Sequence, residues 1–125
     1  MKNVAHTFLV LAILCVLCGM AWGIVMAASG DHLLAPAHAH LNLIGWVTMA
    51  LFGFYYHLVP AAGEKVIAKV HYAIATAGLV IIVPGIVMAI REEGEALAKL
   101  GSVLTLLSML IFVFVVVTSR ARSER

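Results

Sequence analysis

The sequence predicts an all-α integral membrane protein, a four-helix bundle that runs up-down-up-down with both termini on the inner side (N-in/C-in). Of its 125 residues, 64% are hydrophobic and only 11% are charged, whereas soluble domains carry about 25% charged residues. The charged residues also leave four long apolar stretches free. Each stretch has about the 20 residues that a helix needs to cross a hydrocarbon core. Little chain remains between them, so we expect one membrane domain over residues 1–125.

The apolar stretches place the four expected helices at about residues 4–28, 35–58, 70–90 and 98–118. Pro36 fits the first turn of the second helix, where its missing N–H has no helical partner to lose. The first stretch also resembles a signal peptide, because Lys2 precedes it and small residues end it. It is, however, longer than the 7–15 residues of a signal-peptide core. We therefore expect the first helix to be retained.

The basic residues indicate the orientation of the bundle in the membrane. Lysine and arginine accumulate in cytoplasmic loops. The residues that place the termini and the second connection inside are Lys2, Lys65, Lys69, Arg120, Arg122 and Arg125. An even number of spans agrees with two inner termini. The expected location is a bacterial-type inner membrane, and the basic tail is a membrane anchor rather than a nucleic-acid site.

Two histidines at the start of the second expected helix, His38 and His40, are the strongest functional signal. An ionisable side chain within a membrane helix is costly and marks a functional site by default. In a dry helical bundle an imidazole is suited to bind a metal, above all the iron of a heme. On an α-helical wheel at about 100° per residue, the two histidines lie on opposite sides.

The wheel therefore assigns the two histidines to different faces of the helix. The inward stripe that His38 heads contains Asn42, Gly45, Met49, Phe52, Gly53 and Tyr56. The opposite side, which includes His40, contains Val47, Leu51, Phe54 and Leu58. Small and polar residues of membrane helices face neighbouring helices. The wheel thus favours His38 as the inward ligand and leaves His40 for a loop, a second protomer or the membrane interface.

The remaining histidines allow other interpretations. The expected topology puts His32 on the outer side with His38 and His40, and it puts His6, His57 and His71 on the inner side. Two clusters would suit two redox centres, but interfacial imidazoles can also simply bond water. His32, His38 and His40 are alternatively a copper or zinc site, since imidazole binds both metals.

The second expected helix resembles the second helix of the catalytic subunit of heme–copper oxidases. The likeness is to the branch of cbb-type oxidases and nitric oxide reductases. It rests on His40-Leu41-Asn42-Leu43 and on Tyr55-Tyr56-His57-Leu58-Val59-Pro60. The resemblance implies that His40 is an axial ligand of a low-spin heme b, with His38 as the local alternative and Asn42 beside them. It also implies an inner N-terminus with the ligand toward the outer face.

Most of the family's redox centre has no counterpart in this chain. In the family, the second low-spin heme ligand, the copper ligands and the high-spin heme ligand lie on later helices. We therefore expect a miniature relative that binds heme b and transfers electrons, and no enzyme in the chain alone. In a twofold homodimer, His40 of each protomer would share one iron. The alternative is a cofactor-free structural or assembly subunit of a respiratory membrane complex.

Small and hydroxyl-bearing residues suggest how the helices pack. Gly19 and Gly23 form a GxxxG spacing, which allows close approach of helices or dimerisation. Cys15 and Cys18 lie in the same helix and are expected to be small packing residues rather than a redox pair. Three hydroxyl residues of the fourth helix are expected to form interhelical hydrogen bonds, namely Ser102, Thr105 and Ser108.

Overall fold

The computed structural model describes residues 4–123, with side chains described up to residue 119. Lys2 and Arg125 lie outside the described residues, as do the side chains of Arg120 and Arg122. The contribution of these residues to the inner-side assignment therefore stays a prediction.

Every regular element in the described part of the chain is a helix. α1 covers Val4–Ser29, α4 covers Pro60–Gly63, α5 covers Val66–Ile90 and α6 covers Ala96–Ser123. Between α1 and α4, α2 (Ala35–His40), the π-helix η1 (Leu41–Thr48) and α3 (Met49–Leu58) follow one another without a break. We call α2, η1 and α3 together the second helical segment. The prediction of an all-helical protein is thus confirmed.

Three of these helices are long and apolar enough to cross a membrane, within the residues that were described. They are Val4–Ser29, Val66–Ile90 and Ala96–Ser119. The second helical segment differs from them because its winding changes twice along its length. α5 begins four residues before the predicted start at residue 70, and α6 runs beyond residue 118. The reason is that a helix does not have to end where its apolar stretch ends, and lysine and arginine are good helix formers.

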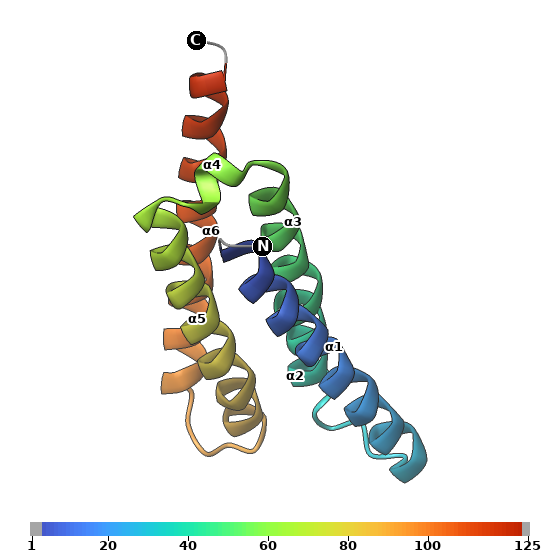
Figure 1. The fold of residues 1–125 in the computed structure, drawn as a ribbon. Coiled ribbons are helices and arrows are strands. Elements are labelled where there is room, and N and C mark those ends of the chain that lie inside the picture. The colour runs from blue at the N-terminus through green and yellow to red at the C-terminus, as the bar shows by residue number, and fades with distance from the viewer. Residues whose placement is uncertain (1–3, 124–125) are drawn as a thin grey trace.

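The helices are arranged as two antiparallel pairs (Figure 1). α1 packs along the second helical segment, α5 packs along α6, and the short α4 lies at the end where the chain passes from one pair to the other. The α1–α2 and α5–α6 connections both lie at the opposite end. The chain therefore reverses direction at each connection.

Glycines set the close approach within each pair. In the first pair, a Cβ added to Gly45 would lie 2.9 Å from the Sγ of Cys15. In the second pair, a Cβ on Gly85 would lie 2.7 Å from the carbonyl carbon of Leu97, and one on Gly101 would lie 2.6 Å from the Cα of Ile82. Small residues allow such backbone contact between membrane helices. Dispersion contacts therefore replace the hydrophobic force that lipid does not provide.

Cys15 and Cys18 are free thiols, the first buried and the second exposed. Cys15 fills the space beside Gly45, which is the packing role expected of it.

An aromatic cluster joins the two pairs. The ring of Phe52 from α3 lies 5.5 Å from that of Phe8 in α1 and 4.6 Å from that of Phe112 in α6. His71 of α5 stands among these rings, with its own centroid 4.4 Å from that of Phe52. Aromatic pairs at such distances add about 0.5–1.5 kcal/mol beyond the burial of their area. This cluster and the packing of α2 against α5 hold one pair against the other.

The close contact of α5 with α6 can be tested at Gly85. A Gly85→Leu variant has to push the backbone of α6 away, and overpacking of this kind costs about 1–3 kcal/mol or more. We expect a lower thermal unfolding midpoint in detergent, measured by circular dichroism. Ala73→Leu is the matched control, because it adds a similar side chain to an exposed position of the same helix. Equal stability of both variants would contradict the packing described here.

Candidate ligand site on the second helical segment

His38 is occupied by contacts within its own helix pair. Its Nε2 lies 2.8 Å from the carbonyl oxygen of Gly19 in α1. Because a carbonyl only accepts hydrogen bonds, this nitrogen donates its proton there. The side-chain amide nitrogen of Asn42 donates to the backbone oxygen of His38 at 3.1 Å, and the ring of Trp22 packs edge-on at 5.7 Å. His38 therefore links α1 to the second helical segment.

The GxxxG spacing of α1 allows this contact between α1 and the second helical segment. A Cβ on Gly19 would clash with the side chain of Asn42, and a Cβ on Gly23 would lie 3.3 Å from the Nε2 of His38. The two glycines thus make room for the polar side chains of the neighbouring segment. Their close approach is intramolecular, and the wheel prediction that His38 and Asn42 face the interior agrees with it.

His40 presents a different arrangement. Its Nδ1 lies 2.7 Å from the carbonyl oxygen of Pro36, one turn earlier. The proton of a neutral ring therefore belongs to Nδ1, and Nε2 carries a free lone pair. In the described part of the chain, no hydrogen bond reaches that Nε2. A backbone carbonyl that holds one ring N–H is the usual partner of a metal-binding histidine, because it fixes the tautomer and the ring.

The π-helix turns His40 toward the second helix pair. Hydrogen bonds in a π-helix run from residue i to i+5, so residues four and five apart remain on one face. His40, Ile44, Thr48 and Met49 consequently line one groove. The α-helical wheel had placed His40 on the side of Val47 and Leu51, and this placement was wrong. The wheel assumed regular α-winding, which η1 does not have.

The groove lies between the second helical segment and the α5–α6 pair, and its volume is about 410 Å³. Its remaining lining residues are Phe52, Ala75, Ile82, Ser102, Thr105, Leu106, Ser108 and Met109. Ligand pockets commonly range from about 300 to 1,000 Å³. Two of its lining residues, Leu106 and Met109, are exposed on α6. It is therefore an open site with a mixed polar and apolar wall.

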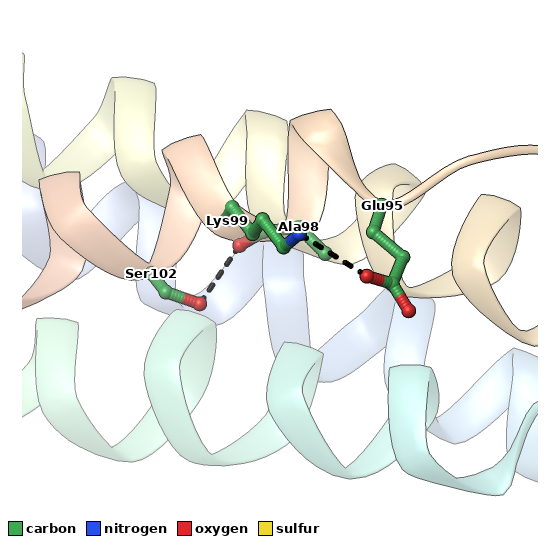
Figure 2. A network of polar contacts seen from close by, with 4 residues as sticks. All are labelled: Glu95, Ala98, Lys99 and Ser102. Atoms are coloured by element: carbon green, nitrogen blue, oxygen red, sulfur yellow. Dashed lines mark hydrogen bonds and ion pairs between the residues drawn. The ribbon is translucent and has the colours of Figure 1, made fainter.

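Three hydroxyl groups of this groove are used within their own helices. Ser102 donates to the carbonyl of Ala98 at 2.7 Å (Figure 2), and Thr105 donates to that of Ser102 at 3.0 Å. The predicted interhelical bonds from these two residues were wrong, because each hydroxyl has one proton and gives it to the preceding turn. Thr48 likewise donates to Leu43 at 2.7 Å. These three hydroxyls therefore offer the groove oxygen lone pairs rather than free donors.

One ion pair lies at the start of α6, close in sequence to the groove residue Ser102. Glu95 and Lys99 are 3.2 Å apart at the start of α6, and Lys99 stands one turn before Ser102 (Figure 2). Both side chains are largely exposed, so the pair adds little stability. Lys99 is consequently a cation that can leave Glu95 for another anionic partner at small cost.

The other predicted ligands are not brought together. His32 is exposed in the α1–α2 connection, where its Nδ1 lies 3.2 Å from the carbonyl oxygen of Gly30. His6 and His57 are exposed near the other end of the bundle. Among residues 4–123 no three or more histidines, cysteines or acidic residues are grouped to hold a metal ion. The copper or zinc set of His32, His38 and His40 thus receives no support from the fold.

His71 forms a buried pair that sequence reasoning missed. It was expected at the inner interface, but it is fully buried, and its Nδ1 lies 2.9 Å from the hydroxyl oxygen of Tyr56. Its Nε2 has no hydrogen-bond partner in the structure. Tyr56 lies near the end of α3 and His71 near the start of α5, with the short α4 between them; this closeness in the sequence was the only signal for their pairing. The rings of Phe8, Phe52 and Phe112 surround His71, so the pair is part of the aromatic cluster.

Comparison with known proteins gives no family for this chain, because no protein-family model, curated protein or solved structure matches it.

The buried pair can be tested by a double-mutant cycle. Tyr56→Phe removes the hydroxyl and leaves the Nδ1 of His71 without this partner, which costs about 1–3 kcal/mol for a buried group. Replacing His71 by Phe as well removes the unsatisfied nitrogen. We therefore expect the double variant to be more stable than the sum of the two single losses predicts. Thermal unfolding in detergent measures the cycle, and strict additivity would show that the two side chains do not interact.

Proposed function

We propose that this chain is a heme b-binding, electron-transfer protein of a bacterial-type inner membrane, and that His40 is an axial ligand of the heme iron. The observation that carries the proposal is the state of the His40 ring. Its Nδ1 is held by the carbonyl of Pro36 at 2.7 Å, and its Nε2 is free. Neutral imidazole with a free ring nitrogen is a common axial ligand of heme iron.

The groove provides further support. It combines an imidazole with apolar walls from Ile44 and Phe52 and with hydroxyl oxygens from α6. An apolar surrounding lowers the local polarity and so helps to set the potential of a bound redox group. His38 is the weaker candidate, because its Nε2 donates to the carbonyl of Gly19 and its Nδ1 lies 3.5 Å from the side-chain amide nitrogen of Asn42. Both of its ring nitrogens thus have polar neighbours within the first helix pair.

The remaining residues take supporting roles in this proposal. Asn42 keeps the second helical segment against α1 through its bond to His38. Lys99, one turn before the groove residue Ser102 on α6, would be a cation for the carboxylates that heme carries. The heme would supply reversible one-electron redox chemistry, while the protein supplies the ligand and the dry walls.

The membrane arrangement belongs to the same proposal. The second helical segment has 24 residues over its three parts, from Ala35 to Leu58, which is enough to cross a hydrocarbon core. With α1, α5 and α6 it gives four spans in the predicted up-down-up-down order. His40 then lies toward the outer side, as the resemblance to heme–copper oxidases implies. Electron transfer rather than oxygen or nitric oxide reduction is the function of this one site.

The second candidate is a cofactor-free subunit that docks onto a respiratory membrane complex. The exposed apolar surfaces of α1 and α6 would suit contact with other membrane subunits as well as with lipid. The free Nε2 of His40 favours the heme proposal over this alternative, because a polar atom left without a partner in a membrane groove has a cost.

A reduced-minus-oxidised visible spectrum of the detergent-purified protein tests the proposal. We expect a b-type band in the unaltered protein, supplied with heme during expression, and loss of the band in His40→Ala. Added imidazole should restore part of the band in this variant by replacing the missing ligand.

His57→Ala is the matched control, since it removes an exposed histidine from the far end of the same helical segment. His38→Ala should reduce stability more than it changes the position of the band. A featureless spectrum of the unaltered protein would refute heme binding, and a normal spectrum of His40→Ala would refute the assignment of the ligand.

A further inference from the structure

We propose that the groove binds the hydroquinone form of a lipid-soluble quinone, with one ring hydroxyl donating to His40 and the other bonded to Ser108. This proposal goes beyond the heme function and does not rest on it. It concerns the chain without iron on His40, because heme and hydroquinone would use the same lone pair of Nε2 and so exclude each other.

The side chains of the groove select an uncharged ligand. None of the described residues that line it is an aspartate, glutamate, lysine or arginine. A charged ligand would therefore leave water without gaining an ion partner, which is costly in an apolar site. The polar groups of the wall are one imidazole and the hydroxyls of serines and threonines. Such a wall suits a neutral ligand that is oriented by a few hydrogen bonds.

His40 can only accept a hydrogen bond from this ligand. Its Nδ1 donates to the carbonyl of Pro36, so the neutral ring has a lone pair and no proton at Nε2. The hydroxyls of Thr48 and Ser102 have also given their protons to their own helices. The ligand therefore has to supply the proton, as a hydroxyl does and a carbonyl or ether oxygen does not.

Ser108 provides a second polar group on the groove wall. It lines the groove and is only 2% exposed. In the described part of the chain its hydroxyl forms no hydrogen bond, unlike those of Ser102 and Thr105. A buried hydroxyl without a partner costs free energy. A ligand oxygen beside Ser108 would remove this cost.

The two polar groups lie at opposite ends of the groove. The ring of Phe52 lies 4.6 Å from that of Phe112, which follows Ser108 by one turn of α6, so Phe52 marks the Ser108 end. The second helical segment and α6 run in the same direction (Figure 1). His40 precedes Phe52 by twelve residues and therefore lies toward the end that Ser102 occupies.

The length of the groove fits a single ring with two hydroxyls. The six residues from Ser102 to Ser108 rise about 9 Å along α6. A para-hydroquinone with a hydrogen bond of about 2.8 Å at each oxygen spans about 11 Å. Ile44 and Leu106 give the wall between the two ends an apolar character, which suits the faces of the ring.

The volume and the open side of the groove fit the rest of the ligand. A cavity of about 150 Å³ holds benzene, whereas the groove has about 410 Å³. The extra volume leaves room for ring substituents. Leu106 is 62% exposed, so the groove is open on this side. The apolar tail of the quinone would leave the groove there and enter the lipid.

The locked ring of His40 makes the site selective for the redox state of the ligand. Both oxygens of the hydroquinone carry protons, whereas both oxygens of the oxidised quinone are carbonyls that only accept. A carbonyl facing Nε2 would place two lone pairs against each other. The hydroxyl of Ser108 can donate to an oxygen of either form. His40 therefore determines the preference for the reduced form, and Ser108 contributes to the binding of both.

The experiment uses the full chain in detergent, without added heme, and a decyl-substituted para-benzohydroquinone with its oxidised form as the matched control. Apparent affinities are obtained under anaerobic conditions from the rise of the thermal unfolding midpoint with ligand concentration. We expect the hydroquinone to bind about tenfold more tightly, which is the contribution of one hydrogen bond. In protein with isotopically labelled histidine, the hydroquinone should move the nitrogen NMR resonance of the His40 Nε2, and the quinone should not.

Three variants separate the roles of the two polar groups. His40→Phe keeps a ring and removes the lone pair, so the two forms should bind about equally, and the missing resonance identifies His40. Ser108→Ala should weaken the binding of both forms by a similar factor and keep the preference for the hydroquinone. His57→Ala is the control, since it removes an exposed histidine from the far end of the same helical segment, and it should change neither affinity.

The outcomes distinguish this proposal from the heme function. Equal binding of the two forms by the unaltered protein, or an unmoved His40 resonance, would overturn it. A preference that survives in a folded His40→Phe variant would do the same. If added heme gives no b-type band while the hydroquinone still binds, the heme function fails and this proposal stands. Heme that binds and displaces the hydroquinone would support both.

Discussion

The contact between Gly19 and the polar side chains of the second helical segment is the constraint on which the rest of the structure depends. The carbonyl of Gly19 accepts a hydrogen bond from His38, and its missing side chain leaves room for Asn42. This contact commits one of two neighbouring histidines to the inside of the first helix pair. The other histidine is thereby left for the second pair. Two residues with the same side chain thus face different helix pairs.

The change of winding directly after His40 then decides what the second histidine faces. With i→i+5 hydrogen bonds the segment brings His40, Ile44 and Thr48 onto the side of α5 and α6. π-Helical turns are uncommon and are frequent at functional sites. The groove is therefore a product of backbone geometry as much as of side-chain choice. The hydroxyls of Thr48, Ser102 and Thr105 donate within their own helices, and His40 keeps a nitrogen lone pair that no hydrogen bond uses.

The helical character of the chain, and the face of the second helical segment that packs against other helices, could be predicted from the sequence. Apolar stretches and small residues are local signals, and Gly45, Phe52 and Tyr56 are buried as their spacing predicted. The side that His40 faces was not predictable, because no residue pattern distinguishes i→i+5 from i→i+4 winding. The pairing of Tyr56 with His71 was also missed, since it depends on the depth at which two separate helices align. The orientation of the helices in the membrane, which was predicted from the positions of the lysines and arginines, stays a prediction.

The π-winding of Leu41–Thr48 has a consequence for how this segment can change in length. A π-turn holds more residues than an α-turn over a similar rise, so the loss of one residue can be absorbed when a turn tightens to α-geometry. A segment shorter by one residue would still be long enough to cross a membrane. The same loss would change the direction of His40 relative to Phe52, because the tightened turn rotates one end of the segment against the other. Insertions and deletions in this segment are therefore limited by the direction in which His40 must point rather than by the length of the helix.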